Sequence, residues 1–379
     1  DLRFVFSNTT EAGIEYKPEP YTPGKCQNTY PAKLASLLYE RFKAFNGAAD
    51  KGLVLIPCEL IDKNGTNLKK CILNYAKDWN LPAEFTAWIN ESNLFVNTLV
   101  DRIVAGYPRA EAAKIEAELG YNDNLIDCGE IFHFFVIEGP QSLSKELPLI
   151  DAGLQVVITD NQTPYRTRKV RFLNGAHTAD VLAASLGGLT FVDEMMNDPD
   201  FGRMVCKAIN DEIFHTVQLP EEEKRFFADS VIERFKNPVA QHRLLSISLN
   251  SVSKWKVRVM PRLLDYVQMK GRLPEVLAFS LAALIRFYML ELKDGAAEGS
   301  VDGRTYPVAD SEDVLRFFAD ATAQFKADGN TAKLVASVLG NKEFWGMDLN
   351  TVPGLAEFAT AKLELINKDG IRSAVKTIL

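Results

Sequence analysis

The 379-residue sequence lacks the features that define several broad classes of protein. No apolar run approaches the length of a transmembrane helix, and no segment has the pattern of a signal peptide. No basic tract stands out, and the net charge of −7 argues against binding to nucleic acids or anionic membranes. As partners we expect neither nucleic acid nor membrane but a small molecule, bound by a cytoplasmic monomer or weak homo-oligomer.

Groups that form disulfides or hold metals are also scarce. The five cysteines are odd in number and include no C-x-x-C pair. This pattern is typical of a reduced cytosolic protein rather than of a disulfide framework or a thiolate zinc site. The four histidines lie far apart and form no H-E-x-x-H motif. The sequence therefore gives no indication of a metal cofactor.

A glycine-rich turn of the form G-x-G-x-x-G, which holds a pyrophosphate at a helix N-terminus, occurs at no predicted strand–helix junction. The chain opens at Asp1 without an initiator methionine, and residues 2–6 already have the pattern of a buried strand. Either the chain binds no dinucleotide, or the turn lies upstream of Asp1. The abrupt opening favours the second explanation, so we expect a Rossmann-type domain whose N-terminal segment is missing.

Two kinds of pattern divide the rest of the sequence. In the first part, short apolar runs typical of strands alternate with helical patterns, which predicts a parallel α/β sheet. After about residue 168 the strand signals nearly vanish and helical periodicity dominates. The fold class is therefore α/β plus all-α. We expect an incomplete Rossmann-type dinucleotide-binding domain over 1–165, followed by a mainly helical substrate domain over 168–379.

The expected elements have the following ranges. We expect strands at 2–6, 52–57, 99–104, 131–137 and 154–158. In the first part we expect helices at 31–46, 66–79, 82–92 and 109–119, with turns at Asn64-Gly65 and 160–165. In the second part we expect a loop at 294–303 and helices at 174–186, 190–197, 200–216, 220–235, 238–268, 274–293, 310–327, 331–340 and 353–375.

The stretch Lys169-Val-Arg-Phe-Leu-Asn174-Gly-Ala-His177 lies at the seam between the two parts and is the strongest candidate for a site. If Asn174 begins or lies within a helix, Asn174 and His177 are one turn apart, and Lys169 just ahead can reach the same spot. The amine can exchange a hydroxyl proton, while the amide and the imidazole can donate to a developing alkoxide. The competing interpretation is a surface lysine, a helix-capping asparagine and a core histidine.

Three separated motifs, one of them in this stretch, resemble those of a known family. The spacing Lys169-x4-Asn174-x2-His177 resembles the signature of the polyol-specific long-chain dehydrogenases, the mannitol dehydrogenase family. Residues 99–103, Leu-Val-Asp-Arg-Ile, resemble the family's Met-Val-Asp-Arg-Ile motif, and residues 234–238 resemble its Arg-Phe-x-Asn-Pro. The sequences of residues 4–13, 56–62 and 352–355 are similar to those of a branch of the family that acts on sugar acids.

The resemblance implies an activity and a cofactor. It implies a metal-independent hydride transfer between NAD(H) and a sugar acid, D-altronate to D-tagaturonate, in the breakdown of hexuronates. One alternative keeps the family and changes the substrate to mannitol, fructose or another polyol or ketose. Another alternative, of a different class, is a non-catalytic helical interaction domain.

The resemblance also assigns the catalytic roles. Lys169 acts as acid in reduction and as base in oxidation, Asn174 donates to the carbonyl oxygen, and His177 binds a substrate hydroxyl. The pKa of a free lysine is about 10.4, so that of Lys169 has to be lowered for work near neutral pH. Partial burial and a nearby cation such as Arg171 would lower it.

Further residues are assigned to the substrate. Asp101 and Arg102 match the family's motif near the site, although a structural ion pair between them explains them equally well. Lys254 falls where the family has a basic substrate ligand, with a solvated lysine as the alternative. An arginine expected eight positions earlier is replaced by Ser246. His242 or Arg243, one turn before Ser246, would take its place.

Two further observations concern the carbonyl and the cofactor. In the mannitol branch an asparagine helps to polarise the carbonyl at the position of Leu60, and leucine cannot do so. Four polar residues follow the end of the first strand and are expected to contact NAD, or else to form a polar turn that satisfies its own backbone. They are Ser7, Asn8, Thr10 and Glu11.

Overall fold

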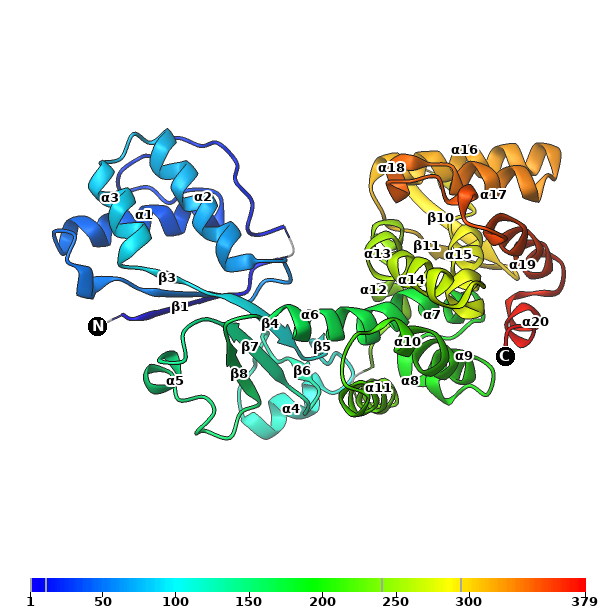
Figure 1. Cartoon of the computed structure of the whole chain (residues 1–379), viewed down its shortest axis with the longest axis horizontal. Coiled ribbons are helices and arrows are strands. Elements are labelled where there is room, and N and C mark those ends of the chain that lie inside the picture. Colours follow the sequence, from blue (N-terminus) through cyan, green and yellow to red (C-terminus); the bar gives the residue numbers. More distant parts are fainter. Residues whose placement is uncertain (1, 11, 240, 294) are drawn as a thin grey trace. The chain divides into compact units, whose positions relative to one another are not determined.

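The computed structural model describes residues 2–10, 12–239, 241–293 and 295–379, and its contacts divide the chain into two compact units (Figure 1). The sheet unit comprises Asp1–Arg102 and Ile131–Arg166. The helical unit comprises Ile103–Glu130 and Thr167–Leu379. The division made from the sequence leaves 103–130 with the first part. In the structure this segment packs in the helical unit, where Glu130 forms a buried ion pair with Arg234.

The sheet unit is built from short strands and the helices between them. Its strands are β1 (Phe4–Ser7), β2 (Val54–Pro57), β3 (Leu94–Phe95), β4 (Asn97–Asp101), β7 (Phe134–Glu138) and β8 (Val156–Thr159). Its helices are α1 (Tyr30–Ala44), the 3-10 turn η1 (Ala49–Lys51), α2 (Asn64–Asp78), α3 (Ala83–Glu91) and α5 (Leu143–Glu146). Helix α6 (Thr163–Lys169) begins in this unit and ends in the helical unit.

Strands β1, β2 and β3 are parallel and lie in that order, which confirms the predicted parallel sheet. All four residues of β2 are buried, as expected for a central parallel strand with both faces covered. Helices α1, α2 and α3 cover one face of these strands (Figure 1). Leu38, Ile72 and Phe85 from these helices belong to the same hydrophobic core as Leu55 of β2. The neighbouring strands are mixed, because β7 runs antiparallel to β4 and parallel to β8.

Two turns predicted in this unit are wrong. Asn64-Gly65 is the first turn of α2, and the fully buried Asn64 side chain donates to the carbonyl of Pro57 at 2.8 Å, so it closes the end of β2. The predicted turn at 160–165 is interrupted by α6, which begins at Thr163. Asn161 Oδ1 accepts a hydrogen bond from the Thr163 amide at 2.9 Å and satisfies a group at the start of that helix.

The helical unit contains most of the elements after α6. Its helices are α4 (Ala112–Leu119), the π-helical η2 (Val170–Asn174), α7 (Gly175–Leu186), α8 (Val192–Asn197), α9 (Phe201–Lys207), the π-helical η3 (Ala208–Ile213), α10 (Phe214–Thr216), α11 (Glu221–Phe235), α12 (Leu244–Ile247), α13 (Ser251–Arg258), α14 (Met260–Lys270), α15 (Glu275–Phe287), α16 (Glu312–Asp328), α17 (Thr331–Leu339), α18 (Lys342–Trp345), the 3-10 turn η4 (Leu349–Thr351), α19 (Leu355–Asp369) and α20 (Ile371–Lys376). Its strands are β5 (Val104–Gly106), β6 (Cys128–Gly129), β9 (Leu290–Lys293), β10 (Ala296–Val301) and β11 (Arg304–Pro307).

Helices α7 and α15 form the centre of this unit. Every residue of α15 except Glu275 and Arg286 is buried, and α7 is buried over nearly its whole length. The two helices pack against each other, and α19 packs on α15 as well. A helix that is apolar on all sides is stable only in such a position. The catalytic stretch predicted from the sequence leads directly into α7, one of these two central buried helices.

The sequence predicts that strand signals nearly vanish after residue 168, and it misses one small sheet in that part of the chain. Strands β9, β10 and β11 form an antiparallel sheet in the order β11-β10-β9. Most of the loop predicted over 294–303 is β10, whose residues alternate between exposed and buried, the period of a strand. Its alanines and glycine hide that pattern in the sequence. Residue 294 lies outside the described residues.

Two predicted helices are also too long. The helix expected over 274–293 ends at Phe287, and its last part is strand β9. The helix expected over 238–268 is divided into α12, α13 and most of α14, and residue 240 lies outside the described part. Asn250 takes a left-handed conformation with φ of 55° before α13, and Pro261 lies in the first turn of α14. Both features interrupt a continuous helix.

Candidate active site

Lys169, Asn174 and His177 lie on one continuous helical run that passes from α6 through η2 into α7. Lys169 is the last residue of α6 and therefore lies in a helix, not ahead of one as the sequence predicts. The η2 segment is π-helical, and the amide of Gly175 donates to the carbonyl of Val170, five residues earlier. A π turn brings residues five apart into neighbouring turns, which suits the spacing of Lys169 and Asn174.

The imidazole of His177 is the most buried of the three groups, with 4% of the residue exposed, while Lys169 and Asn174 are half-buried. Its ring stacks on Phe235, with the ring centroids 4.0 Å apart, and faces the edge of His242 at 5.4 Å. Among the described residues, Nε2 of His177 has no hydrogen-bond partner. An unsatisfied, buried ring nitrogen is costly unless a ligand completes it.

Several basic groups act on the imidazole of His177. Burial lowers the pKa of His177 well below its usual range, and His242, Arg234, Arg258 and Lys254 lower it further. The imidazole is therefore neutral at physiological pH, and one ring nitrogen carries a proton while the other is an acceptor. A neutral imidazole of this kind can form hydrogen bonds with a substrate hydroxyl.

Arg234, the first residue of the predicted Arg-Phe-x-Asn-Pro motif, forms a buried ion pair with Glu130. Its Nη2 lies 2.8 Å from Glu130 Oε1 and its Nε lies 3.1 Å from Oε2, a two-pronged contact. Glu130 Oε1 also accepts a hydrogen bond from the Ile103 amide at 2.6 Å. Because its charge is compensated by Glu130, Arg234 shapes the site rather than offering a cation to a substrate.

Lys254 and His242 lie close to this cluster. Lys254 is half-buried on α13, and its Nζ donates to the carbonyl of Ile247 at 3.0 Å, so it is not a solvated surface lysine. Burial lowers the pKa of His242, Glu130 raises it and Lys254 lowers it. His242 thus stands beside His177, whereas the exposed Arg243 lies over the ring of Phe191 at 5.1 Å.

Two arginines show where sequence reasoning was incomplete. The Nη1 of Arg171 donates to the carbonyl of Thr216 at 2.7 Å, and burial and the neighbouring Arg262 lower its pKa. Arg258 was not singled out in the sequence, yet its charge acts on His177. Its spacing of four residues from Lys254 on α13 is the signal that would have identified it.

In the sheet unit, the predicted cofactor residues lie at the carboxyl end of β1. Glu59, which is buried, accepts hydrogen bonds from Ser7 Oγ at 3.0 Å and from the amide and hydroxyl of Thr9 at 3.1 and 2.9 Å. Asn8 and Thr10 are exposed beside this anchored turn, and Glu11 lies outside the described residues. Ligands of α/β proteins bind at the carboxyl ends of parallel strands.

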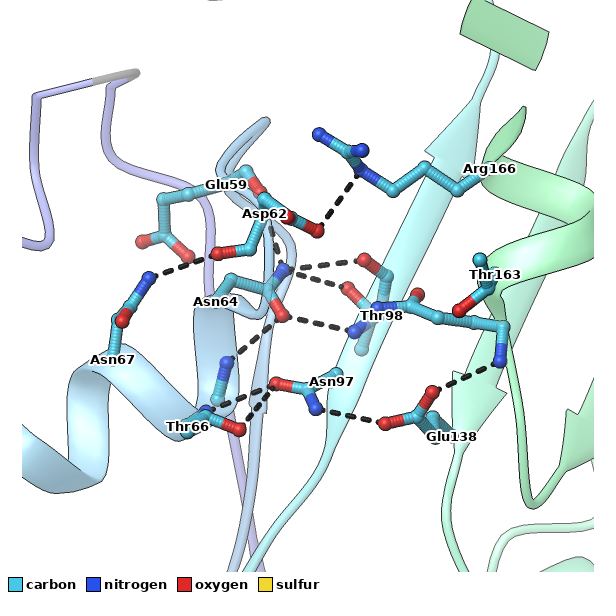
Figure 2. A network of polar contacts seen from close by, with 12 residues as sticks. Glu59, Asp62, Asn64, Thr66, Asn67, Asn97, Thr98, Glu138, Thr163 and Arg166 are labelled. Carbon is cyan, nitrogen blue, oxygen red and sulfur yellow. Dashed lines mark hydrogen bonds and ion pairs between the residues drawn. The ribbon is translucent and has the colours of Figure 1, made fainter.

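Figure 2 shows the polar network that fixes the ends of the neighbouring strands. Asn64 Nδ2 donates to the Thr98 hydroxyl at 3.1 Å, and Asn64 Oδ1 accepts from the Thr98 amide at 2.9 Å. Asn97 donates to Glu138 at 2.9 Å, and Arg166 lies 3.1 Å from Asp62. These contacts set the position of β4, which ends at Asp101.

The remaining predicted residues have different degrees of exposure. Asp101 is the last residue of β4, where it is in register with Phe134, and only 1% of it is exposed. Arg102 directly follows the strand and is exposed. Leu60 is 62% exposed, and its aliphatic side chain offers no hydrogen bond to a carbonyl.

Two further findings concern metal ions and membranes. Within the described ranges, no group of three or more histidine, cysteine or acidic residues is arranged to hold a metal ion. None of the helices in the same ranges is both long and apolar enough to cross a membrane.

A Rossmann-type sheet and a helical domain, with a lysine, an amide and a neutral imidazole on one helical run, define a class of dehydrogenase. The Rossmann domain model of mannitol dehydrogenase matches residues 4–151, and the model of its C-terminal domain matches residues 161–367. The chain belongs to the mannitol dehydrogenase family of oxidoreductases.

Relatives agree with this assignment, and two solved structures have a similar fold. The chain is 48% identical to the altronate oxidoreductase of Enterobacter sp. (strain 638), over all of this chain and 77% of the relative. It is 48% identical to that of Yersinia pestis, over 99% of this chain and 76% of the relative. The fold is similar to Pseudomonas fluorescens mannitol 2-dehydrogenase in complex with NAD and D-mannitol, with a TM-score of 0.72 and 21% identity, over 99% of this chain and 74% of that one. A D-sorbitol dehydrogenase gives a TM-score of 0.74 at 21% identity, over 98% of this chain and 74% of that one.

Proposed function

We propose that this protein is an NAD-dependent oxidoreductase that interconverts D-altronate and D-tagaturonate, with Lys169 as the general acid and base. The observation that carries the proposal is the helical run that bears Lys169, Asn174 and His177, in a chain 48% identical to altronate oxidoreductases. The π turn within that run supports the proposal, since such turns occur often at functional sites.

In this proposal the sheet unit binds NAD, which supplies the acceptor or donor of the hydride. The turn after β1 fits a dinucleotide, because Glu59 anchors it while Asn8 and Thr10 stay exposed to offer an amide and a hydroxyl. Ser7 and Glu11 complete the set that we assign to the cofactor. We place the NAD-binding domain at 1–165 and the substrate domain at 168–379.

The chain's own residues carry the proton chemistry. In oxidation, the neutral amine of Lys169 takes the proton of the reacting hydroxyl, and in reduction the ammonium returns it. Asn174 donates a hydrogen bond to the same oxygen and stabilises its developing charge. Because Leu60 cannot add a second donor, Asn174 carries this role without help from that position. His177 binds a neighbouring hydroxyl through its unsatisfied ring nitrogen.

The substrate's other polar groups are assigned to Asp101, Arg102, His242 and Lys254. Asp101 and Arg102 suit hydroxyls as acceptor and donor, and Lys254 and His242 lie beside His177 in an electropositive environment. We place the protein in the cytoplasm, in keeping with its unpaired cysteines. We expect it to be a monomer or a weak homo-oligomer.

Kinetics of Lys169→Ala test the proposal. We expect kcat for tagaturonate reduction by NADH to fall by roughly 10²–10⁴-fold, the usual contribution of a general acid. Lys224→Ala, which removes a half-buried lysine that lies over the Phe214 ring, serves as the matched control and should leave kcat unchanged. Equal rates in the wild type and Lys169→Ala would exclude the assigned mechanism.

A substrate panel tests the substrate. We expect kcat/KM to be highest for tagaturonate and altronate, and lower for fructose and mannitol. A higher value for a neutral ketose would move the protein to a polyol dehydrogenase. No turnover of any sugar in the presence of NAD(H) would favour the non-catalytic alternative.

A further inference from the structure

Helix α13 carries two cations on one flank. Val252 and Trp255 lie on its buried face, and Lys254 and Arg258, four residues apart, lie next to each other on one side of that face. Both side chains are half-buried. Lys256 lies on the opposite flank, where its Cε comes within 3.6 Å of a Cβ placed on Gly346.

The helix that carries Lys254 and Arg258 lies next to the candidate site. Helix α13 packs against α7 and η2, the elements that carry His177 and Asn174. The contact is close at Gly175, between these two residues, because a Cβ there would lie 3.7 Å from the carbonyl oxygen of Arg258. The charges of both cations also act on the imidazole of His177.

Other cations of the helical unit have different assignments. Arg234 is compensated by Glu130 in a buried two-pronged ion pair. Arg171 and Arg262 both donate to the carbonyl of Thr216. The sequence offers His242 or Arg243 as the replacement for a lost family arginine. In the structure Arg243 lies over the ring of Phe191 and lines a cavity of about 220 Å³ with Arg304.

We propose that Arg258, together with Lys254, binds the carboxylate of the sugar acid and determines the preference for a sugar acid over a neutral polyol. This inference rests on the proposed function. A guanidinium can hold a carboxylate through two parallel hydrogen bonds, and the neighbouring ammonium adds a second charge.

The charge balance around His177 favours an anionic ligand. Arg258 and Lys254 both lower the pKa of His177, so the pocket holds positive charge at a buried group. A carboxylate is attracted by both cations, whereas the hydroxymethyl end of a polyol carries no charge for them to attract. The same two cations thus favour the acid over its neutral analogue.

The test is the ratio of kcat/KM for tagaturonate to that for fructose, in the wild type and in Arg258→Gln. We expect the ratio to fall about ten- to hundredfold, the range for loss of a hydrogen bond to a charged group, mainly through KM for tagaturonate. Arg258→Lys should keep part of the ratio, since it retains the charge but not the paired donors. Inhibition constants of D-gluconate and D-mannitol give the same comparison without turnover.

Matched controls separate this role from a structural one. Lys256→Gln removes the same charge from the other flank of α13 and should leave the ratio unchanged. Arg243→Gln tests the arginine expected from the sequence and should also leave it unchanged. Thermal unfolding of each variant, followed by circular dichroism, shows that the compared proteins are folded.

Two results would overturn the proposal. One is an equal fall of kcat/KM for tagaturonate and fructose in Arg258→Gln, which indicates a structural role. The other is a loss of the ratio in Arg243→Gln but not in Arg258→Gln. Failure of the proposed function is seen separately, because it appears as absence of tagaturonate turnover in the wild type.

Discussion

The imidazole of His177 lies face to face with the ring of Phe235, with the ring centroids 4.0 Å apart and the planes at 9°. His177 comes from α7 and Phe235 from the end of α11, so two family motifs meet in this contact. Nε2 of His177 has no hydrogen-bond partner among the described residues. The contact with Phe235 therefore fixes the orientation of the ring that is proposed to bind the substrate.

Phe235→Leu should therefore affect both the stability and the substrate affinity. We expect the free energy of unfolding to fall by about 1–2 kcal/mol, because stacking and part of the buried volume are lost. We also expect KM for tagaturonate to rise, because the imidazole loses its flat support. Urea unfolding and steady-state kinetics measure the two effects. Phe226→Leu, at an exposed position of the same helix, is the control, and an equal effect there would contradict this account.

The buried pair of Arg234 and Glu130 makes the stability of the helical unit sensitive to loss of one partner. The side chains are only 6% and 3% exposed, so Arg234→Met leaves the Glu130 carboxylate buried without its cation. We expect a loss of about 3–5 kcal/mol. The double variant Glu130→Leu/Arg234→Met should recover part of that loss. A double variant as unstable as the sum of two singles would show that the residues do not act as a pair.

The buried carboxyls of Asp180 and Glu212 predict a stability that falls as the pH rises. Burial raises the pKa of Asp180 well above its usual range, with Glu212 as a second cause, and burial raises that of Glu212 to about 7. Both oxygens of Asp180 lack partners among the described residues, while Glu212 accepts from the amides of Val276 and Leu277 at 2.8 and 2.9 Å.

The sign follows from proton binding. Between the ordinary carboxyl pKa of about 4 and the raised value, the native state holds more protons than the unfolded state, so each pH unit removes up to about 1.4 kcal/mol per group. The urea midpoint should thus be lower at pH 7.5 than at pH 5. Asp180→Asn should flatten this dependence and raise the midpoint at pH 7.5. Identical pH profiles for Asp180→Asn and the wild type would rule Asp180 out as a source.

Glu59 should control the affinity for the cofactor. Glu59→Gln replaces an oxygen that accepts from Ser7 or Thr9 with a donor, so the turn after β1 loses an anchor. We expect the Kd for NADH to rise about three- to tenfold, equivalent to the loss of one ordinary hydrogen bond, with little change in KM for tagaturonate. NADH fluorescence titration measures it. Glu84→Gln, on the exposed surface of α3, should bind NADH as the wild type does.

Much of the sheet unit was predictable because its parallel strands are short, apolar and separated by well-marked helices. The runs at 2–6 and 52–57 correspond to β1 and β2, and the helix at 31–46 to α1. Strands β9 to β11 were missed, since Ala, Gly and charged residues mask the alternation of β10. A π turn such as η2 has no mark in local propensity, because it depends on how the helix is packed.

The candidate site was predictable only as far as its motifs extend. Lys169, Asn174 and His177 were identified by spacing, and their catalytic roles stay predictions. Glu59 and Arg258 were missed because their significance comes from tertiary contacts: one anchors a turn from another strand, and the other lies on a helix packed at Gly175. Single-sequence patterns contain no information about such partners.

The Glu130–Arg234 pair also constrains how the chain can be cut and how it can fold during synthesis. The partners are 104 residues apart in sequence, and the segment that ends in Glu130 is followed by a return to the sheet unit. A fragment that starts at residue 167 would thus leave Arg234 buried without its carboxylate. On the ribosome, residues 103–130 emerge long before Arg234, so Glu130 cannot form the ion pair until the later segment has been synthesised. The helical unit is therefore assembled from two pieces of chain, and it would require co-expression of both pieces if it were produced apart.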